Sequence, residues 1–125
     1  MQEVSVIIPN FNGMAYLDGV LAGLECQSVN NFEVILVDNG SSDGSCAFVA
    51  ARYPWVHLIE LPENFGFCKA VNEGIKASRA PYVLLLNNDI EVTENFIEEM
   101  IFAIKRHPKA FSCAARMIQF HDRDK

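Results

Sequence analysis

Short apolar runs that end in clusters of Asn, Asp, Gly or Pro, each followed by residues at helical spacing, constrain this chain more than any other feature. The runs typical of strands cover residues 4–8, 32–37, 55–61 and 82–86. Strands that alternate with helices are typical of a parallel sheet covered on both faces. The run at 32–37 is apolar except for Glu33, as expected of a strand buried on both faces. We therefore predict an α/β fold with a mostly parallel sheet and helices on both faces.

The spacing of apolar residues predicts which face of each helix is buried. In the first helix this face contains Leu17, Val20, Leu21 and Leu24. A second helix follows the polar residues 38–45 and ends before Pro54. The inner face of the third contains Phe67, Ala70, Val71, Gly74 and Ile75. The fourth is capped by Thr93, has acids near its start and basic residues near its end, and buries Phe96, Ile97, Met100, Ile101 and Ile104. Residues 111–120 are expected to form a fifth strand.

The composition excludes several classes of function. With 125 residues, half of them apolar, the chain is sufficient for one domain with a core. Lys and Arg number 10 against 16 Asp and Glu, and the net charge of −6 argues against nucleic-acid binding. No apolar stretch approaches the roughly 18 residues of a membrane span. Because the start of the chain also lacks the pattern of a secretory signal, we expect a cytoplasmic location and no transmembrane segment.

Polar residues collect where the predicted strands end. In chain order, the clusters contain Asn10 and Asn12, Asp38 and Asp43, Asn64, and Asn87, Asn88 and Asp89. In an open parallel sheet, ligands bind outside the carboxyl ends of the strands. Any single cluster is equally well explained by turns and helix caps, for which Asn, Asp and Gly are suited, and we expect Asp43 to cap the second helix. Four clusters on one edge favour a binding site.

Four segments resemble the inverting nucleotide-sugar glycosyltransferases of family 2, which have the GT-A fold. The segments are VSVIIPNFNG at 4–13, VDNGSSDGS at 37–45, NFGF at 64–67 with Ala70 and NEGI at 72–75, and LLLNND at 84–89. They occur in the order and spacing of the family, and are most similar to its rhamnosyltransferase-like branch. The resemblance implies a Rossmann-like GT-A fold, in which residues 1–120 form the nucleotide-sugar-binding part of the domain and residues 121–125 form a tail.

The resemblance also implies how the donor would be bound. Asp38 would accept a hydrogen bond from the ring N3–H of uracil or thymine, which cytosine lacks, so UDP- or dTDP-sugars are the expected donors. Guanine also has a ring N–H, so the family pattern alone argues against GDP-sugars. The base and the ribose would be bordered by Pro9, Asn10 and Phe11. The other expected donor-binding residues are Asn64, Gly66, Asn72 and Asn88, the last of these at ribose or sugar hydroxyls.

Asp89 resembles the last acid of the DxD motif, with which the family holds Mg²⁺ or Mn²⁺ against the diphosphate of the donor. The metal neutralises charge that develops on the leaving group. Here the motif is Asn87-Asn88-Asp89, with one acid where the family often has two, so we expect weaker metal binding or a ligand from elsewhere. The alternative interpretation of this segment is an Asx turn at the end of a strand.

We assign no catalytic residue within these 125 residues. Inverting transfer needs a general base that deprotonates the acceptor hydroxyl, and in the family this carboxylate follows the DxD segment. We expect the base and the site for a saccharide or lipid-linked acceptor beyond residue 125, so that this chain is a truncated, donor-binding half that is inactive alone. The intact enzyme would act in cell-surface polysaccharide biosynthesis, in the cytoplasm or at the membrane periphery. An uncovered edge strand ending at Phe120 would favour self-association.

Two other functions stay open. A sugar nucleotidyltransferase has a similar sheet topology, but it needs a Gly-rich loop with a basic residue after the first strand. Residues 9–13 contain neither Lys nor Arg, which argues against this class. A non-catalytic binding or scaffold domain would fit the single acid of the Asn87-Asn88-Asp89 segment and the early end of the chain.

Overall fold

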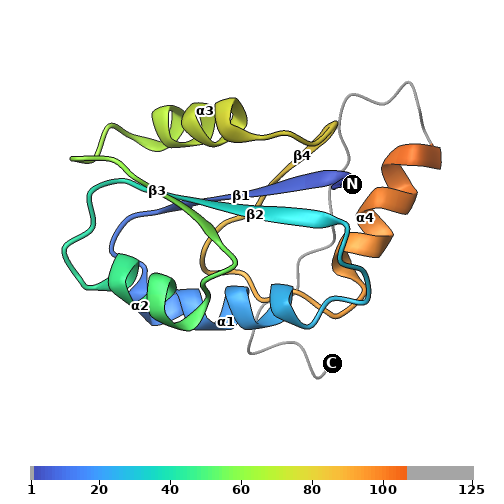
Figure 1. Ribbon diagram of the computed structural model, residues 1–125, viewed down its shortest axis with the longest axis horizontal. Helices are drawn as coiled ribbons and strands as arrows, with labels where there is room; N and C mark the ends of the chain where they lie inside the picture. Colours follow the sequence, from blue (N-terminus) through green and yellow to red (C-terminus); the bar gives the residue numbers. More distant parts are fainter. Residues whose placement is uncertain (1, 107–125) are drawn as a thin grey trace.

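Four parallel strands form one sheet in the computed structural model, which describes residues 2–106 (Figure 1). The strands are β1 (Val4–Asn10), β2 (Phe32–Asp38), β3 (His57–Glu60) and β4 (Tyr82–Leu85). Their order in the sheet is β3-β2-β1-β4, and every pairing is parallel. The chain moves outward from β1 to β3 and then returns past β1 to add β4 on its other side. The predicted parallel α/β fold is confirmed.

One helix joins each pair of consecutive strands. α1 (Met14–Glu25) and α2 (Ser45–Arg52) cover one face of the sheet, and α3 (Phe67–Ala77) covers the other (Figure 1). α4 (Phe96–Arg106) follows β4 and contributes Ile97 to the same core as α1. None of the four helices in this stretch is long and apolar enough to cross a bilayer. The helices therefore cover both faces of the sheet, as predicted, and leave the strand ends to the loops.

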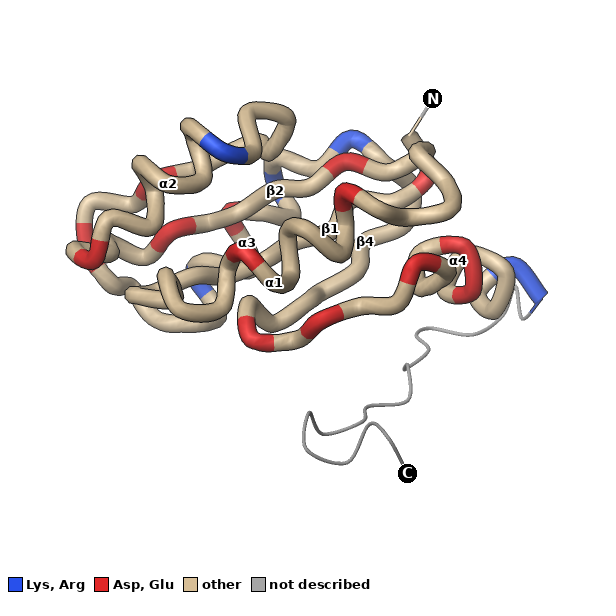
Figure 2. The backbone as a smooth tube through the Cα atoms, turned by 90° about the horizontal axis from the view of Figure 1, so that it is seen from below, with Lys and Arg blue, Asp and Glu red and all other residues tan. Residues whose placement is uncertain are grey.

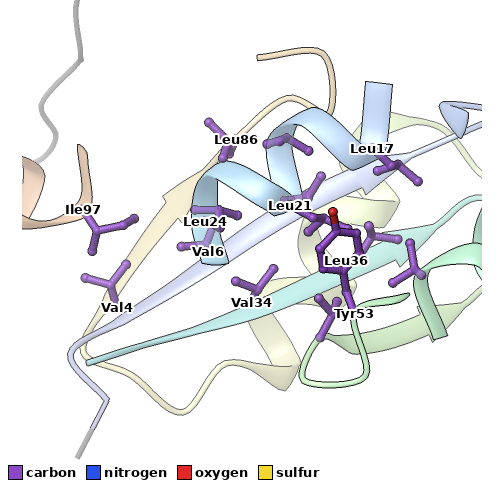
Figure 3. Close-up of a cluster of buried hydrophobic side chains, with 14 of the residues drawn as sticks. Val4, Val6, Leu17, Leu21, Leu24, Val34, Leu36, Tyr53, Leu86 and Ile97 are labelled. Atoms are coloured by element: carbon purple, nitrogen blue, oxygen red, sulfur yellow. The ribbon is translucent and has the colours of Figure 1, made fainter. Parts of the chain in front are cut away.

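The main core lies between the sheet and the layer of α1, α2 and α4 (Figure 3). The predicted inner face of α1 is confirmed, since all four of its residues are at most 1% exposed: Leu17, Val20, Leu21 and Leu24. They pack against inward-facing residues of the two central strands, namely Val4, Val6, Ile8, Val34 and Leu36. Truncating one such leucine to alanine typically costs about 2–5 kcal/mol. This layer therefore holds the ends of β1 and β2 in a fixed relation.

On the opposite face of the sheet, α3 is the one helix among residues 2–106. Its buried cluster contains Ile35, Val37 and Ala70. Gly74 lies so close to β1 that an added Cβ would be 2.6 Å from Cγ2 of Ile7. The predicted inner face of α3 is right for Ala70 and Gly74 and wrong for Phe67 and Ile75, which are 53% and 46% exposed. Because the two small residues bring the helix close to the sheet, the larger side chains are directed outward.

The predicted third strand is shorter than its apolar run. β3 begins at His57, whereas the run begins at Trp55. The difference arises because the chain first turns after α2, with the N–H of Val56 donating to the carbonyl of Tyr53 (3.0 Å). Hydrophobicity alone does not separate such a turn from the strand that follows it.

The start of α4 is capped differently from the prediction. Within the described part of the chain, the side chain of Thr93 makes no capping hydrogen bond. Instead, the side-chain amide of Gln27 accepts the N–H of Ile97 (2.8 Å) and donates to the carbonyl of Thr93 (2.6 Å). A cap from a residue 70 positions away is invisible to a local pattern. The acids in the first turn and the basic residues in the last turn are placed as predicted and match the helix dipole (Figure 2). The predicted strand at 111–120 and the tail at 121–125 lie outside the described residues.

Candidate functional site

The strand register brings the ends of β1, β2 and β4 together. Asn10, the last residue of β1, lies opposite Asp38, the last residue of β2. On the other side, β1 pairs with β4 as far as Ile7 and Leu85, so the segment after β4 leaves the sheet beside Asn10. The direction of strand addition reverses at β1, and such a switch point is where ligands bind to open α/β sheets. The predicted gathering of polar clusters at one edge is confirmed for these three strands.

The side chain of Asn10 connects the three loops. It is 1% exposed, and its Nδ2 donates to Oδ1 of Asp38 (2.8 Å), to Oγ of Ser45 (3.1 Å) and, more weakly, to Oγ of Ser41 (3.4 Å). Its Oδ1 accepts a hydrogen bond from Nδ2 of Asn88 (2.7 Å). Both ends of the amide are therefore used within the protein. A buried polar group that is satisfied in this way holds its partners in one arrangement.

Asp38 is the acceptor at the centre of the β2 end and is 2% exposed. Besides Asn10, the backbone N–H and the hydroxyl of Ser41 donate to its carboxylate at 2.8 and 2.6 Å, and so does the thiol of Cys46. Burial acts to raise the pKa of Asp38, but these donors outweigh it, so the pKa lies below its ordinary value of 3.8. Asp38 is therefore ionised at neutral pH.

Cys46 lies beside Asp38 at the start of α2 and responds in the opposite sense. Burial, the hydrogen bond to Asp38 and the negative charge of that carboxylate raise the pKa of the thiol to about 12. A protonated thiol is a weak nucleophile. Cys46 therefore serves as a hydrogen-bond donor in this framework and not as a reactive group.

Asp43 holds the first turns of two helices. Its Oδ1 accepts the N–H (3.0 Å) and the hydroxyl (2.6 Å) of Ser45, the first residue of α2, and its Oδ2 accepts the N–H of Met14, the first residue of α1 (2.9 Å). These hydrogen bonds, led by that of the Ser45 hydroxyl, lower the pKa of Asp43. The N-cap residue of α2 is Gly44 and not the predicted Asp43, although Asp43 does bind the first N–H of the helix. The bond to α1 adds a link that the sequence did not reveal.

Asn39 belongs to the site and was not singled out by the sequence analysis. It is 5% exposed, and its side chain donates to the carbonyl of Gly66 (3.2 Å) and accepts the N–H of Phe65 (3.3 Å). Its own N–H donates to the carbonyl of Asn10 (2.8 Å). Asn39 thus joins the loop before α3 to the ends of the central strands. Its position directly after a central strand, between the loops of both neighbours, was the available signal.

The loop that leads into α3 carries two of the predicted donor-binding residues. Oδ1 of Asn64 accepts the N–H of Gly66 (2.8 Å), which is an Asx turn. Gly66 has φ +94°, and an added Cβ would meet nothing within 4 Å, so its backbone conformation accounts for the glycine. Asn72, the third predicted residue of this region, lies exposed on α3.

Two exposed aromatic rings lie in the loops that carry these polar residues. Phe11, which follows Asn10 directly, is 48% exposed, and Phe65 is 46% exposed. Pro9 is partly buried within β1. Aromatic faces that remain open beside a polar site are suited to stacking against a base or a sugar.

The segment after β4 carries an exposed acid, Asp89, directly after the partly buried Asn88. Asp89 is exposed and, within residues 2–106, makes no hydrogen bond or ion pair, while its neighbour Asn88 is held by Asn10. No three His, Cys, Asp or Glu side chains of the described chain come together in a way that would hold a metal ion. Asp89 is therefore a single carboxylate that is available to a ligand.

The chain belongs to glycosyl transferase family 2, because the family described as "Glycosyl transferase family 2" matches residues 5–125. Among curated relatives, the "Putative teichuronic acid biosynthesis glycosyltransferase TuaG" of Bacillus subtilis (strain 168) is 27% identical over 123 residues, which are 95% of this chain and 48% of TuaG. The chain spans about a third to a half of the length of the curated relatives that it matches first.

Many solved structures are similar to this chain, and two of them illustrate the shared fold. Staphylococcus aureus TarS 1–349, solved in complex with UDP, superposes with a TM-score of 0.77 at 24% identity, over 94% of this chain and 38% of that chain. The mannosyltransferase PcManGT of Pyrobaculum calidifontis, solved with GDP-Man and Mn²⁺, gives a TM-score of 0.74 at 22% identity, over 91% of this chain and 36% of that chain. These similarities confirm the predicted GT-A-like arrangement of a parallel sheet and helices.

Proposed function

We propose that this edge of the sheet binds the nucleotide part of a nucleotide-sugar donor, and that the whole protein transfers the sugar to an acceptor with inversion. The observation that carries the proposal is the Asn10–Asn88 hydrogen bond, because each partner is followed by an exposed group suited to a donor. Phe11 follows Asn10 and offers an aromatic face, and Asp89 follows Asn88 and offers a carboxylate. Membership of glycosyl transferase family 2 supports this proposal, as does the binding of UDP by TarS.

For the base, the proposed contacts are those of Asp38 and of the segment formed by Pro9, Asn10 and Phe11. Four donors already reach the carboxylate of Asp38, so the N3–H of uracil or thymine would compete with the Ser41 hydroxyl for one of its oxygens. The ring would stack on Phe11. A UDP- or dTDP-sugar is the donor that this arrangement favours, and affinity for UDP well above that for CDP would support the Asp38 contact.

Asp89 is the residue that we propose to hold Mg²⁺ or Mn²⁺. Mg²⁺ is commonly bound by one or two carboxylates together with substrate phosphates, and the exposed carboxylate of Asp89 at the binding edge fits that pattern. When bound, the cation would neutralise negative charge on the leaving diphosphate. The Mn²⁺ in the PcManGT complex supports the choice of cation. Asn64, Gly66, Asn72 and Asn88 complete the proposed donor pocket.

The other parts of the reaction are proposed to lie beyond this set of residues. The general base and the acceptor site are placed after residue 125, and the name of TuaG supports a saccharide acceptor in the synthesis of a cell-surface polymer. A place in the rhamnosyltransferase-like branch, a cytoplasmic or membrane-peripheral location and inactivity of this chain alone stay predictions. So does self-association, because the edge strand predicted to end at Phe120 lies outside the described residues.

A non-catalytic binding or scaffold role is the second candidate function. The observation that favours it is the single acid of the Asn87-Asn88-Asp89 segment, together with the absence of a three-ligand metal cluster from residues 2–106. A sugar nucleotidyltransferase is disfavoured, because the chain belongs to a glycosyltransferase family.

The test is a calorimetric titration of the chain with UDP, with and without Mn²⁺, and with CDP as the control. Saturable UDP binding that tightens with Mn²⁺ and exceeds CDP binding would support the donor site. Binding that ignores the metal would favour the scaffold role. No binding at millimolar UDP would contradict a donor site formed by these residues alone.

A further inference from the structure

The side-chain amide of Asn10 is hydrogen-bonded to the loops on both sides of β1. Asn10 is buried, yet the segment that carries the exposed Asp89 is attached to it through Asn88. We propose that Asn10 is a positioning residue for the cation site: through Asn88 it fixes where Asp89 stands relative to the loops that would hold the nucleotide. This inference rests on the proposed function and deepens it by giving the side chain of Asn10, besides its proposed place at the base, a role at the cation site.

The direction of the Asn10 amide is determined by its neighbours. The hydroxyl of Ser45 donates its proton to Asp43 (2.6 Å), so its oxygen is left to accept from Asn10. The ionised carboxylate of Asp38 can only accept. Both partners therefore require the Nδ2 group of Asn10, and its Oδ1 must face the other way, toward the Nδ2 of Asn88. If the amide of Asn10 were flipped, its Oδ1 would face the acceptor oxygens of Asp38 and Ser45. The loop after β2 therefore determines that Asn10 presents its Oδ1 to Asn88, which must bind through its Nδ2.

The start of α1 covers this pair of amides closely. A Cβ added at Gly13 would lie 2.1 Å from Nδ2 of Asn88 and 2.3 Å from Oδ1 of Asn10. The backbone of Gly13, at φ −97° and ψ 23°, is not in the left-handed region, so close approach to the amides is what excludes a side chain. The contact leaves the Asn88 side chain no room to move toward α1 while it is bonded to Asn10.

The three linked residues differ in their exposure to solvent. Asn10 is 1% exposed, Asn88 is partly buried and Asp89 is exposed, so contact with solvent increases step by step along the link. A change at Asn10 can reach a bound cation only through its neighbours. If Asn88 served only as a direct donor contact, its removal would act independently of Asn10, whereas a link predicts that the two residues act as one unit.

The quantity to measure is the ratio of the UDP dissociation constant without Mn²⁺ to that with Mn²⁺, obtained by calorimetry. Asn88→Ala removes the donor of the link, and Asn10→Ser removes its acceptor while it leaves a hydroxyl at the end of β1. Each variant should lower the ratio by roughly fivefold, the effect of one hydrogen bond. The double variant should show no more loss than either single variant. Asn95→Ala, at an exposed position before α4, is the matched control and should leave the ratio unchanged.

Gly13→Ala provides an independent test, because it leaves both amides in the sequence and forces them apart. It should lower the same ratio, and it should add nothing to the ratio in the Asn88→Ala background. Urea unfolding and near-ultraviolet circular dichroism identify any variant that fails to fold; should Asn10→Ser fail, Gly13→Ala and Asn88→Ala still form a complete cycle.

The outcomes separate this inference from the proposed function. Full additivity of Asn88→Ala with Asn10→Ser, or with Gly13→Ala, in a chain that binds UDP with Mn²⁺ would overturn the positioning role and leave the donor site intact. An unchanged ratio in folded Asn88→Ala or Gly13→Ala would do the same. The absence of UDP binding by the parent chain would overturn the donor site, and the positioning role with it.

Discussion

The ends of β1 and β2 and the end of β4 use the same residue types for different purposes. At the β1–β2 end, Asn10 and Asp38 are buried, and every polar group of their side chains has a partner within the protein. At the β4 end, Asn87 and Asp89 are exposed, and among the side chains of residues 87–89 that of Asn88 alone is hydrogen-bonded within the described part of the chain. Asn and Asp at a strand end are therefore either bonded within the protein, as Asn10 and Asp38 are, or left open to a ligand, as Asp89 is. The proposed contact of Asp38 with the base would have to replace one of its present partners.

The two ends should therefore respond differently to mutation. Changes in the framework should appear first in the free energy of unfolding, because buried donors or acceptors lose their partners. Changes at the exposed end should leave that free energy nearly unchanged and appear in ligand binding.

Asp38→Ala should have the largest effect. It removes the shared acceptor of Asn10, Ser41 and Cys46, and because an unsatisfied buried donor costs about 1–3 kcal/mol, we expect a total loss of about 3 kcal/mol in the free energy of unfolding. Asp89→Ala should change it by less than about 0.5 kcal/mol and abolish any Mn²⁺-dependent part of UDP binding. Urea unfolding and calorimetry measure the two effects. Equal losses of stability in the two variants would show that the two strand ends do not differ in their contribution to the fold.

Gly40→Ala should destabilise the framework by about 2 kcal/mol. Gly40 has φ +76°, and an added Cβ would lie 2.7 Å from the Cα of Glu63, in the loop before α3. Gly44→Ala is the matched control, since Gly44 also has positive φ, at +84°, but an added Cβ there meets nothing within 4 Å. It should cost only the conformational part, about 1 kcal/mol. If both variants unfold at the same urea concentration, the close approach at Gly40 contributes nothing to stability.

Acid should weaken the framework. The pKa of Asp38 lies below its ordinary value of 3.8 in the folded chain, so the folded state binds this proton less readily than the unfolded state. The resulting stability is fully present above the unfolded pKa and is lost as the pH falls through the folded pKa. We expect this contribution to be steady from about pH 7 to pH 5 and to decline below about pH 4. Urea titrations across this range should show a shallower decline for Asp38→Asn than for the parent chain.

The sequence was sufficient to predict the strands, the parallel sheet and the edge at which the polar clusters meet. These features depend on local periodicity and on the register of parallel strands, both of which are encoded in short segments. The buried face of α1 was predicted for the same reason, since all four of its apolar positions are in the core.

What the sequence could not predict depends on contacts between distant residues. The cap of α4 comes from Gln27, and the outward directions of Phe67 and Ile75 follow from the close approach of Gly74 to Ile7. In the candidate site, the sequence identified Asn10 and Asp38 but did not show that they are bonded to each other. Whether such a residue is bonded within the protein or left open to a ligand depends on these tertiary contacts, and the pattern of residue types alone does not contain it.

Asn87→Asp should have the smallest effect on the fold, and it tests whether the exposed end of β4 binds the cation. It places a second acid two residues before Asp89, at an exposed position, and more carboxylate ligands favour a divalent cation. We expect UDP binding to tighten about threefold in the presence of Mn²⁺ and to weaken without it, because the added charge then faces the diphosphate unscreened. Asn95→Asp makes the same change of net charge away from the sheet edge and should alter neither value. An increase in affinity without metal, or an equal shift in both variants, would show that the segment after β4 does not approach the diphosphate.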